Sequence, residues 1–173
     1  MDYRRPEPLG KQHQAGDFAC GEEALDDWLK RHALAAQASD SARVFVTTAD
    51  DGLTVRGYYA ISAAQVEPEE ASVRALKGQP SARPVAAIVL ARFAVDRQHQ
   101  RQGLGRSLML GVLLRCAHAA DTIGARVLLV HAKNEAARQW YMQYDFEESR
   151  TDPLHLMLLM KDIRQFLRTH GLE

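Results

Sequence analysis

An apolar run, a glycine-rich loop and a long amphipathic segment follow one another in the middle of this chain. Residues 83–95 (RPVAAIVLARFAV) are mostly apolar over a length that suits a buried central strand. After the loop, apolar residues recur every three or four positions and predict a helix of about twenty residues that ends near Gly124; they are Leu104, Leu108, Val112, Cys116, Ala119 and Ile123. The pattern predicts a sheet strand followed by a helix that packs one face on the sheet.

The loop between them reads Gln100-Arg101-Gln102-Gly103-Leu104-Gly105-Arg106. Backbone N–H groups at the start of a helix, together with the helix dipole, can bind phosphate. Gly103 and Gly105 remove Cβ atoms where an anion must approach the backbone, and Arg101 and Arg106 add positive charge. The loop therefore predicts a pyrophosphate site, with a plain glycine-rich turn as the alternative.

Other ligand classes are disfavoured by their missing motifs. The chain has no GxxxxGK[ST] and no full GxGxxG with an acidic residue about 20 positions later, which argues against nucleoside triphosphates and NAD. Cys20 and Cys116 are the only cysteines, and the seven histidines include no HExxH pair, so we expect no metal and two buried, inert thiols.

The N-terminal half predicts an arm, a helix and a hairpin. Residues 1–17 are interpreted as an extended arm or a first edge strand, and residues 22–38 as one amphipathic helix. Strands over residues 43–49 and 54–63 flank Asp50-Asp51-Gly52 and predict an antiparallel hairpin. Residues 67–81 are weakly helical.

The C-terminal half predicts alternating elements. We expect a strand over residues 126–131, a helix over 134–144, a turn over 146–149, a strand over 154–160 and a short closing helix. Together these elements predict a mixed sheet with packed helices, an α/β or α+β architecture.

Composition predicts one ordinary globular domain over residues 1–173, with 46% apolar and 25% charged residues. The 22 basic and 22 acidic residues balance, so any contact with nucleic acid must be local. No apolar run approaches the ~20 residues that span a bilayer, and the N-terminus lacks a signal-peptide core, so we expect a cytoplasmic protein.

Two segments resemble the GNAT N-acetyltransferase family. Gln100-x-x-Gly103-x-Gly105 after LARFAVD resembles its acetyl-CoA motif, and residues 134–146 resemble its second cofactor segment, with Trp140 for the usual Phe and Asp145 for the usual Gly. Because aspartate enters the left-handed region readily, the turn at Asp145 can survive. The resemblance implies the GNAT fold, a mostly antiparallel mixed sheet with helices on both faces, and acetyl-CoA as co-substrate without a metal. It implies cofactor contacts from Phe93, Ala94, Val95, Gln100, Arg101, Gln102, Gly103, Leu104, Gly105, Arg106, Ser107, Asn134 and Ala137.

The N-terminal half resembles one branch of that family, the TacT- and AtaT-like toxins. The similar segments are Phe18-Ala19-Cys20-Gly21, Leu25-Asp26-x-Trp28-Leu29, Ala42-Arg43-x-Phe45-Val46 and Gly57-Tyr58-Tyr59-Ala60. The resemblance implies acetylation of the α-amino group of aminoacyl-tRNA, a block of translation, a ribbon-helix-helix antitoxin and a homodimer.

The predicted central strand gives independent support for an α-amine substrate. Residues 84–95 contain no Asp, Glu or His that could act as a general base. An α-amine with a pKa of ~7.8 is roughly a tenth unprotonated at pH 7, against about one part in 2,500 for a lysine at ~10.4. An α-amino substrate therefore fits the missing base better than a lysine side chain.

The resemblance implies that Tyr141 is the general acid that protonates the departing CoA thiolate, and we expect a backbone N–H near Val95 to stabilise the oxyanion. A half-buried aromatic residue on a helix is the alternative for Tyr141, and a helix N-cap is the alternative for Asn134. Lys30, Arg31, Arg83 and Arg92 are candidates for contact with tRNA phosphates, with a solvated charged surface as the alternative.

Two other functions remain open on the sequence. One is a GNAT enzyme that acetylates a small-molecule amine or a protein N-terminus, which needs a closed acceptor pocket. The other is a non-catalytic module that binds CoA or a partner protein, which predicts indifference to Tyr141→Phe.

Overall fold

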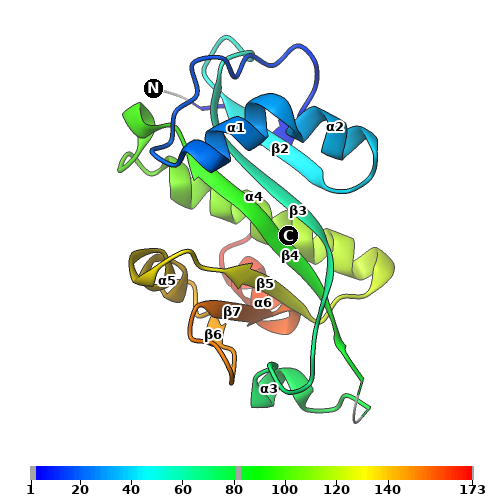
Figure 1. Cartoon of the computed structure of the whole chain (residues 1–173). Helices are drawn as coiled ribbons and strands as arrows, with labels where there is room; N and C mark the ends of the chain where they lie inside the picture. The colour runs from blue at the N-terminus through cyan, green and yellow to red at the C-terminus, as the bar shows by residue number, and fades with distance from the viewer. Residues whose placement is uncertain (1–2, 81–82, 173) are drawn as a thin grey trace. The chain divides into compact units, whose positions relative to one another are not determined.

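The computed structural model describes residues 3–80 and 83–172, and within them a single mixed sheet of seven strands (Figure 1). The strands follow the order β1-β2-β3-β4-β5-β7-β6. Strands β4 and β5 are parallel, whereas β1–β2, β2–β3, β5–β7 and β6–β7 are antiparallel. The strand bounds are β1 Glu7–Pro8, β2 Arg43–Thr48, β3 Val55–Val66, β4 Val85–Val95, β5 Val127–His131, β6 Glu147–Glu148 and β7 His155–Leu159. The predicted mixed sheet, with residues 85–95 as its central strand, is confirmed.

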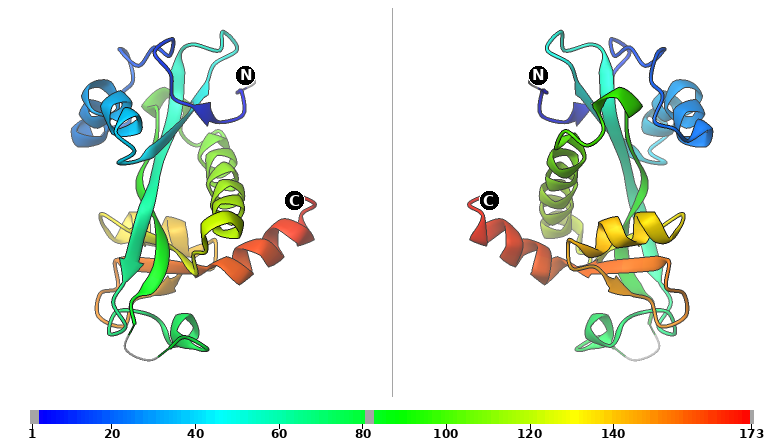
Figure 2. Two further views of the ribbon diagram at one scale, coloured as in Figure 1. Left: turned by 90° about the vertical axis from the view of Figure 1, so that its right-hand side faces the viewer. Right: turned by 90° about the vertical axis from the view of Figure 1, so that its left-hand side faces the viewer.

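Six α-helices and one short 3-10 helix connect these strands in the described ranges: α1 Glu23–Arg31, α2 Ala33–Ala38, α3 Val73–Leu76, η1 Arg97–His99, α4 Leu104–Ile123, α5 Glu135–Met142 and α6 Met160–Thr169. Helix α4 is one uninterrupted helix, which can be followed in both views of Figure 2. It ends before Gly124, whose φ of 72° is the left-handed conformation that ends many helices. The predicted twenty-residue helix is confirmed.

The chain forms two compact units. Unit 1 comprises residues 1–62 and 91–112, and unit 2 comprises residues 63–90 and 113–173. Strands β3 and β4 and helix α4 each begin in one unit and end in the other. Each unit has a hydrophobic cluster of its own, and the single domain expected from composition stays a prediction.

Unit 1 is built on the hairpin of β2 and β3. Val44 pairs with Ala60 and Val46 with Tyr58, and Gly52 takes a φ of 70° in the connecting turn. Val44, Val46, Tyr58 and Ala60 are all fully buried, together with Leu29 and Ala33 from the two helices that follow the arm. The predicted hairpin is confirmed.

The helix expected over residues 22–38 is wrong in one respect, because it is two consecutive helices. The break lies at His32, where φ −122° and ψ −23° depart from helical geometry. The side chain of Gln37 ties α2 to its neighbours: its amide nitrogen donates to Leu9 O, and its oxygen accepts the Val44 N–H at 2.8 Å. These tertiary bonds override a sequence that contains no helix breaker at the junction.

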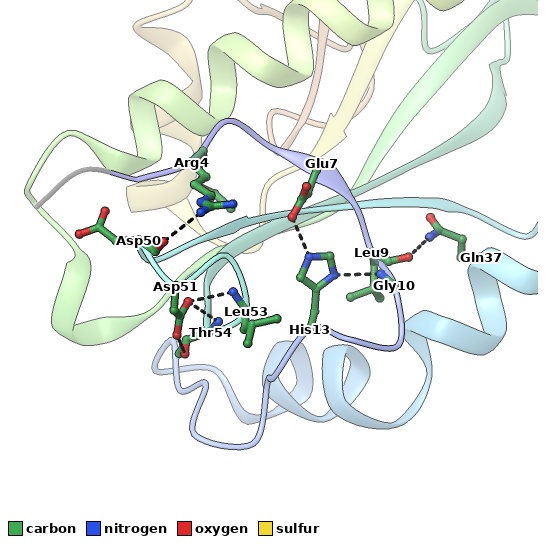
Figure 3. A network of polar contacts seen from close by, with 11 residues as sticks. Arg4, Glu7, Leu9, Gly10, His13, Gln37, Asp50, Asp51, Leu53 and Thr54 are labelled. Atoms are coloured by element: carbon green, nitrogen blue, oxygen red, sulfur yellow. Dashed lines mark hydrogen bonds and ion pairs between the residues drawn. The ribbon is translucent and has the colours of Figure 1, made fainter.

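Polar contacts bind the N-terminal arm to the rest of unit 1 (Figure 3). The buried ring of His13 lies between two groups of the arm, with Nε2 2.9 Å from Glu7 Oε1 and Nδ1 accepting the Gly10 N–H at 2.9 Å. Arg4 donates to Asp50 O at 3.1 Å, and its own carbonyl accepts from Thr47 Oγ1 at 2.6 Å. The alternative of an edge strand for this segment is confirmed by β1, which pairs with β2.

Unit 2 contains the parallel pair β4–β5, with Ala87 opposite Val127 and Val89 opposite Leu129. Strand β7 pairs along the whole of β5 and leads directly into α6 (Figure 2). The turn expected over residues 146–149 is partly wrong, because β6 forms there and pairs with β7. Only two of its residues enter the ladder, so the strand is too short to give an alternating pattern.

The two thiols differ in burial: Cys116 is buried, as expected, whereas Cys20 is only half-buried, so the expectation of a buried thiol is wrong for Cys20. Burial, assisted by a hydrogen bond with Asp26, raises the pKa of Cys20 to about 11, and burial raises the pKa of Cys116 to about 12. In the described part of the chain, no helix is long and apolar enough to cross a membrane. No cluster of three or more potential metal ligands occurs among the same residues.

Candidate active site

The loop that leads into α4 has an unusual backbone. Arg101 and Gly103 both lie in the left-handed region, with φ 60° and 86°, on either side of Gln102. A Cβ added to Gly103 would meet no atom within 4 Å, so the space above it is open. Alternation of left-handed and ordinary residues turns successive N–H groups toward a common point, which is a geometry that binds anions.

The charge at the loop also favours an anionic ligand. Gly105 and Arg106 lie in the first turn of α4, where N–H groups have no acceptor within the helix. The side chains of Arg101 and Arg106 are exposed, and neither forms an ion pair with a carboxylate of the described residues. Two free guanidinium groups beside the positive end of a twenty-residue helix fit a diphosphate.

Three polar side chains fix the shape of this loop within unit 1. The carboxylate of Asp96, which is 4% exposed, accepts the N–H of Gln98 at 3.0 Å and that of Ala19 at 3.2 Å. The amide of Gln100 donates to Val95 O and Cys20 O, both at 2.9 Å. The amide of Gln102 donates to Gln98 O at 3.1 Å. The shape of the loop is therefore stabilised by hydrogen bonds within the protein.

The end of β4 leads into this loop. Ala94 and Val95 are buried and Phe93 is half-buried, while the Asp96 N–H donates to Arg56 O at 2.8 Å on β3. The structure thus brings the residues predicted at positions 93–95 and 100–107 together as one continuous strand end, loop and helix start. Asp96 was missed as a site residue because a single acidic residue after a strand is also typical of a turn.

Helix α5 in unit 2 presents the other predicted residues. Asn134 caps it, since its Oδ1 accepts the Ala137 N–H at 2.9 Å, and the N-cap interpretation is thereby confirmed. Asp145, which follows the helix, takes a φ of 67°, so the residue that replaces the usual glycine does enter the left-handed region. The expected survival of that turn is confirmed. That Asn134 and Ala137 also contact the cofactor stays a prediction.

Tyr141 lies on α5 between two other aromatic rings. Its ring meets Trp140 edge-on, with centroids 5.2 Å apart, and Phe146 at 5.8 Å. Burial raises the pKa of the Tyr141 phenol above its usual value. The phenol therefore stays protonated at neutral pH, which is the state that a general acid requires.

The four basic candidates differ in their surroundings. Lys30 and Arg31 are exposed in the last turn of α1, and Arg83 is exposed before β4 in unit 2. Arg92 on β4 is different, because its guanidinium lies 5.1 Å from the centre of the half-buried Trp28 ring. Trp28 in turn stacks on the buried ring of Tyr58, with centroids 6.1 Å apart and an interplanar angle of 11°. The structure thus holds Arg92 in place, whereas the other three are solvated side chains.

Known proteins are similar to this chain in sequence and in fold. A family model described as "Acetyltransferase (GNAT) domain" matches residues 40–148. The chain belongs to the GNAT acetyltransferase family. A tRNA-acetylating toxin of Mycobacterium tuberculosis is 43% identical to it over 165 residues, which are 95% of this chain and 97% of the relative.

Solved structures agree with this GNAT acetyltransferase over almost its whole length. A tyrosine-to-phenylalanine mutant of KacT aligns with a TM-score of 0.88 and 26% identity, covering 96% of this chain and 99% of that chain. AtaT complexed with acetyl-methionyl-tRNAfMet aligns with a TM-score of 0.87 and 24% identity, with the same coverage. AtaT was also solved with acetyl-CoA and the C-terminus of its antitoxin AtaR. The GNAT fold and the place of the chain in the toxin branch, both expected from the sequence, are confirmed.

Proposed function

We propose that this chain transfers the acetyl group of acetyl-CoA to the α-amino group of an aminoacyl-tRNA and so blocks translation. The observation that carries the proposal is a preformed anion-binding loop at the start of α4 in a GNAT acetyltransferase that is 43% identical to a tRNA-acetylating toxin. Acetyl-CoA supplies the activated acetyl group. The residues of this chain bind it, orient it and supply a proton.

The loop from Gln100 to Ser107 holds the diphosphate of the donor. Backbone N–H groups at Gly103 and Gly105 bind its oxygens, and the unpaired guanidinium groups of Arg101 and Arg106 neutralise its charge. The side chains of Gln100 and Gln102, which are engaged in holding the loop, act by fixing its shape. We assign Leu104 and Ser107 to the same contact surface through their place in the first turn of α4.

The end of β4 positions the thioester. Phe93 and Ala94 contact the donor at the end of the strand, and the backbone N–H of Val95 polarises the thioester carbonyl that the amine attacks. Asn134 and Ala137 at the start of α5 contribute contacts to the same donor. Since residues 84–95 contain no acidic residue and no histidine, the reaction relies on an amine that is already partly unprotonated.

Tyr141 protonates the CoA thiolate as the C–S bond breaks, and the proton that the amine nitrogen loses on forming the amide C–N bond returns the phenolate to the phenol. Burial keeps its phenol in the protonated form, and its edge-on contacts with Trp140 and Phe146 restrict the orientation of the ring. A general acid placed in this way contributes roughly 10²–10⁴-fold to the rate.

Arg92 is the best supported of the four tRNA candidates. Its place over Trp28 keeps the guanidinium oriented, and no described carboxylate neutralises it, so it is available for a phosphate of the acceptor end. Lys30, Arg31 and Arg83 are exposed charges that add long-range attraction. The overall charge balance of 22 to 22 agrees with a contact limited to a few such residues.

An antitoxin and a second copy of the chain complete the proposal. The resemblance to the toxin branch favours a ribbon-helix-helix antitoxin, and the AtaT structure with the C-terminus of AtaR supports a protein inhibitor of this kind. The same resemblance favours a homodimer. The cytoplasm is the compartment of the proposed substrate.

Transfer of labelled acetyl from acetyl-CoA to a pool of charged tRNA tests the function, with the same tRNA left uncharged as control. We expect label on charged tRNA alone, and a loss of about 10²–10⁴-fold in kcat for Tyr141→Phe with acetyl-CoA binding unchanged. Label on small amines but not on charged tRNA would contradict the choice of substrate. Full activity of Tyr141→Phe would remove Tyr141 as the general acid.

Arg92→Gln tests the acceptor contact, with Arg43→Gln as its matched control. Arg43 already pairs with Asp40 at 2.7 Å, so its loss should leave tRNA binding unchanged. Arg92→Gln should raise KM for charged tRNA by several-fold and reduce the salt dependence of KM, because one phosphate contact is lost. Equal effects of the two variants would argue against a specific role for Arg92.

A further inference from the structure

The N-terminal arm contacts the loop that we propose holds the donor diphosphate. The Tyr3 hydroxyl lies 2.8 Å from His99 Nδ1, and the two rings meet edge-on at an interplanar angle of 83° with centroids 5.7 Å apart. The same hydroxyl donates to Gln102 Oε1 at 3.4 Å. The two partners are 96 and 99 positions away in the sequence, so these contacts join the beginning of the chain to its central motif.

Gln102 lies at the centre of the loop that we propose binds the diphosphate. It stands between Arg101 and Gly103, the two left-handed residues that turn the backbone N–H groups toward one point. Both polar atoms of its terminal amide are bonded, since Nε2 donates to Gln98 O at 3.1 Å and Oε1 accepts from Tyr3 at 3.4 Å. A side chain whose amide is fixed by two bonds restrains the backbone between the two left-handed residues.

His99 links Tyr3 to the short helix η1, which directly precedes the loop. Its ring is buried, with 7% of the residue exposed, in the short helix η1 whose first turn is held by Asp96. Tyr3 is the polar partner that the structure gives to Nδ1 of this ring. If Nδ1 carries the proton and donates to Tyr3, the Tyr3 proton is available for Gln102, and the three side chains form one directed series of hydrogen bonds.

The arm itself is anchored, so Tyr3 has a fixed place. Arg4 is bound through its backbone N–H to Thr48 O at 3.2 Å and through its carbonyl to Thr47 Oγ1. Pro6 lies against α4, because a Cβ added to Gly111 would approach Pro6 Cγ to 3.1 Å. The contacts of Arg4 and its neighbours in Figure 3 show the arm held along β2.

We propose that Tyr3 is a positioning residue for acetyl-CoA: through His99 and Gln102 it holds the diphosphate-binding loop in its binding shape. The inference rests on the proposed role of the loop. A loop fixed before binding loses less conformational freedom when the ligand arrives, so the effect of Tyr3 falls on donor affinity and leaves the chemical step unchanged. The effect of Tyr3 is therefore limited to donors that contain the diphosphate.

The test compares two donors in wild type and in Tyr3→Phe, which keeps the ring and removes only the hydroxyl. Acetyl-CoA has the diphosphate, and acetyl-pantetheine lacks it. We expect Tyr3→Phe to raise KM for acetyl-CoA and the Kd of CoA in titration calorimetry by about three- to tenfold, with kcat unchanged. The kcat/KM for acetyl-pantetheine should be the same in both proteins.

Tyr58→Phe is the matched control, because its hydroxyl also bonds within unit 1, donating to Leu25 O at 2.7 Å, but does not touch the loop. It should leave the ratio of the two donors unchanged. An unchanged CoA Kd in Tyr3→Phe, or an equal loss with both donors, would overturn the inference. If wild type itself uses the two donors equally well, the loop does not hold a diphosphate, and the proposed function of the loop fails with it.

Discussion

Replacement of Asp96 by asparagine removes one of the two carboxylate oxygens that hold the base of the donor loop. In the wild type one oxygen accepts the Gln98 N–H at 3.0 Å and the other accepts the Ala19 N–H at 3.2 Å, at a residue only 4% exposed. Whichever way the asparagine amide is turned, one backbone N–H faces an NH₂ group and loses its acceptor away from water. A buried donor without a partner costs about 1–3 kcal/mol.

The expected loss corresponds to a fall in Tm of roughly 2–4 °C for each kcal/mol in a chain of this size. Urea denaturation followed by circular dichroism measures the loss of unfolding free energy. Titration with CoA should give a higher Kd, because the loop is held less firmly.

Asp51→Asn is the matched control for the buried site. One oxygen of Asp51 accepts from both Leu53 N–H and Thr54 N–H, at 2.8 and 2.9 Å. The hydrogen bond from the Thr54 hydroxyl to the other oxygen, followed by these two bonds, lowers the pKa of Asp51 to about 2. Asparagine keeps the oxygen that accepts the two N–H groups, and the site is exposed to water. Asp51→Asn therefore loses only the stabilisation of the charge that the lowered pKa reflects, which solvent screens, and its urea midpoint should fall less than that of Asp96→Asn. A loss in Asp96→Asn no larger than in Asp51→Asn would refute the reasoning from burial.

Two further results are expected. Burial and the neighbouring His155, which stacks on it at 4.1 Å, lower the pKa of His131, so the folded state favours the neutral ring. Stability should therefore be lost as pH falls below about 6.5, and His131→Phe should show a smaller drop in urea midpoint between about pH 7.5 and pH 5 than the wild type; an equal drop would contradict this assignment. A Cβ at Gly57 would lie 3.0 Å from Thr47 Cγ2 and 3.4 Å from Ala94 O, so Gly57→Ala should lower the free energy of unfolding by about 1–3 kcal/mol. Gly16→Ala is the control: a Cβ there would meet no atom within 4 Å, so this substitution should cause no loss of stability through steric contact.

Local patterns predicted the elements on which the site is built. The apolar run before Gly103 and the spacing after it identified β4, the loop and α4, because each signal lies within a few neighbouring residues. Asp145 could be placed in the left-handed region because it stands where the family pattern has glycine and because aspartate enters that region readily, and its φ of 67° agrees.

Contacts between distant residues could not be predicted in this way. The break at His32 depends on bonds from Gln37 to Leu9 and Val44, and the restraint on Gln102 depends on Tyr3. No periodicity links positions so far apart in a single sequence. The role of Asp96 was hidden for the same reason, since its second partner is the N–H of Ala19.

The division of the chain into two interleaved units affects how the protein can be made. Unit 1 closes only when residues 91–112 are added to residues 1–62, and unit 2 requires residues up to the end of the chain. During synthesis, which adds about 5–20 residues per second, neither unit can be completed before the first half of the chain has left the ribosome. The donor loop and α5 are made in separate stages, so a nascent chain that ends before Tyr141 has the proposed binding loop without the proposed acid. Under the proposed function, this order delays the acetylation of aminoacyl-tRNA until the segment that contains Tyr141 has been made.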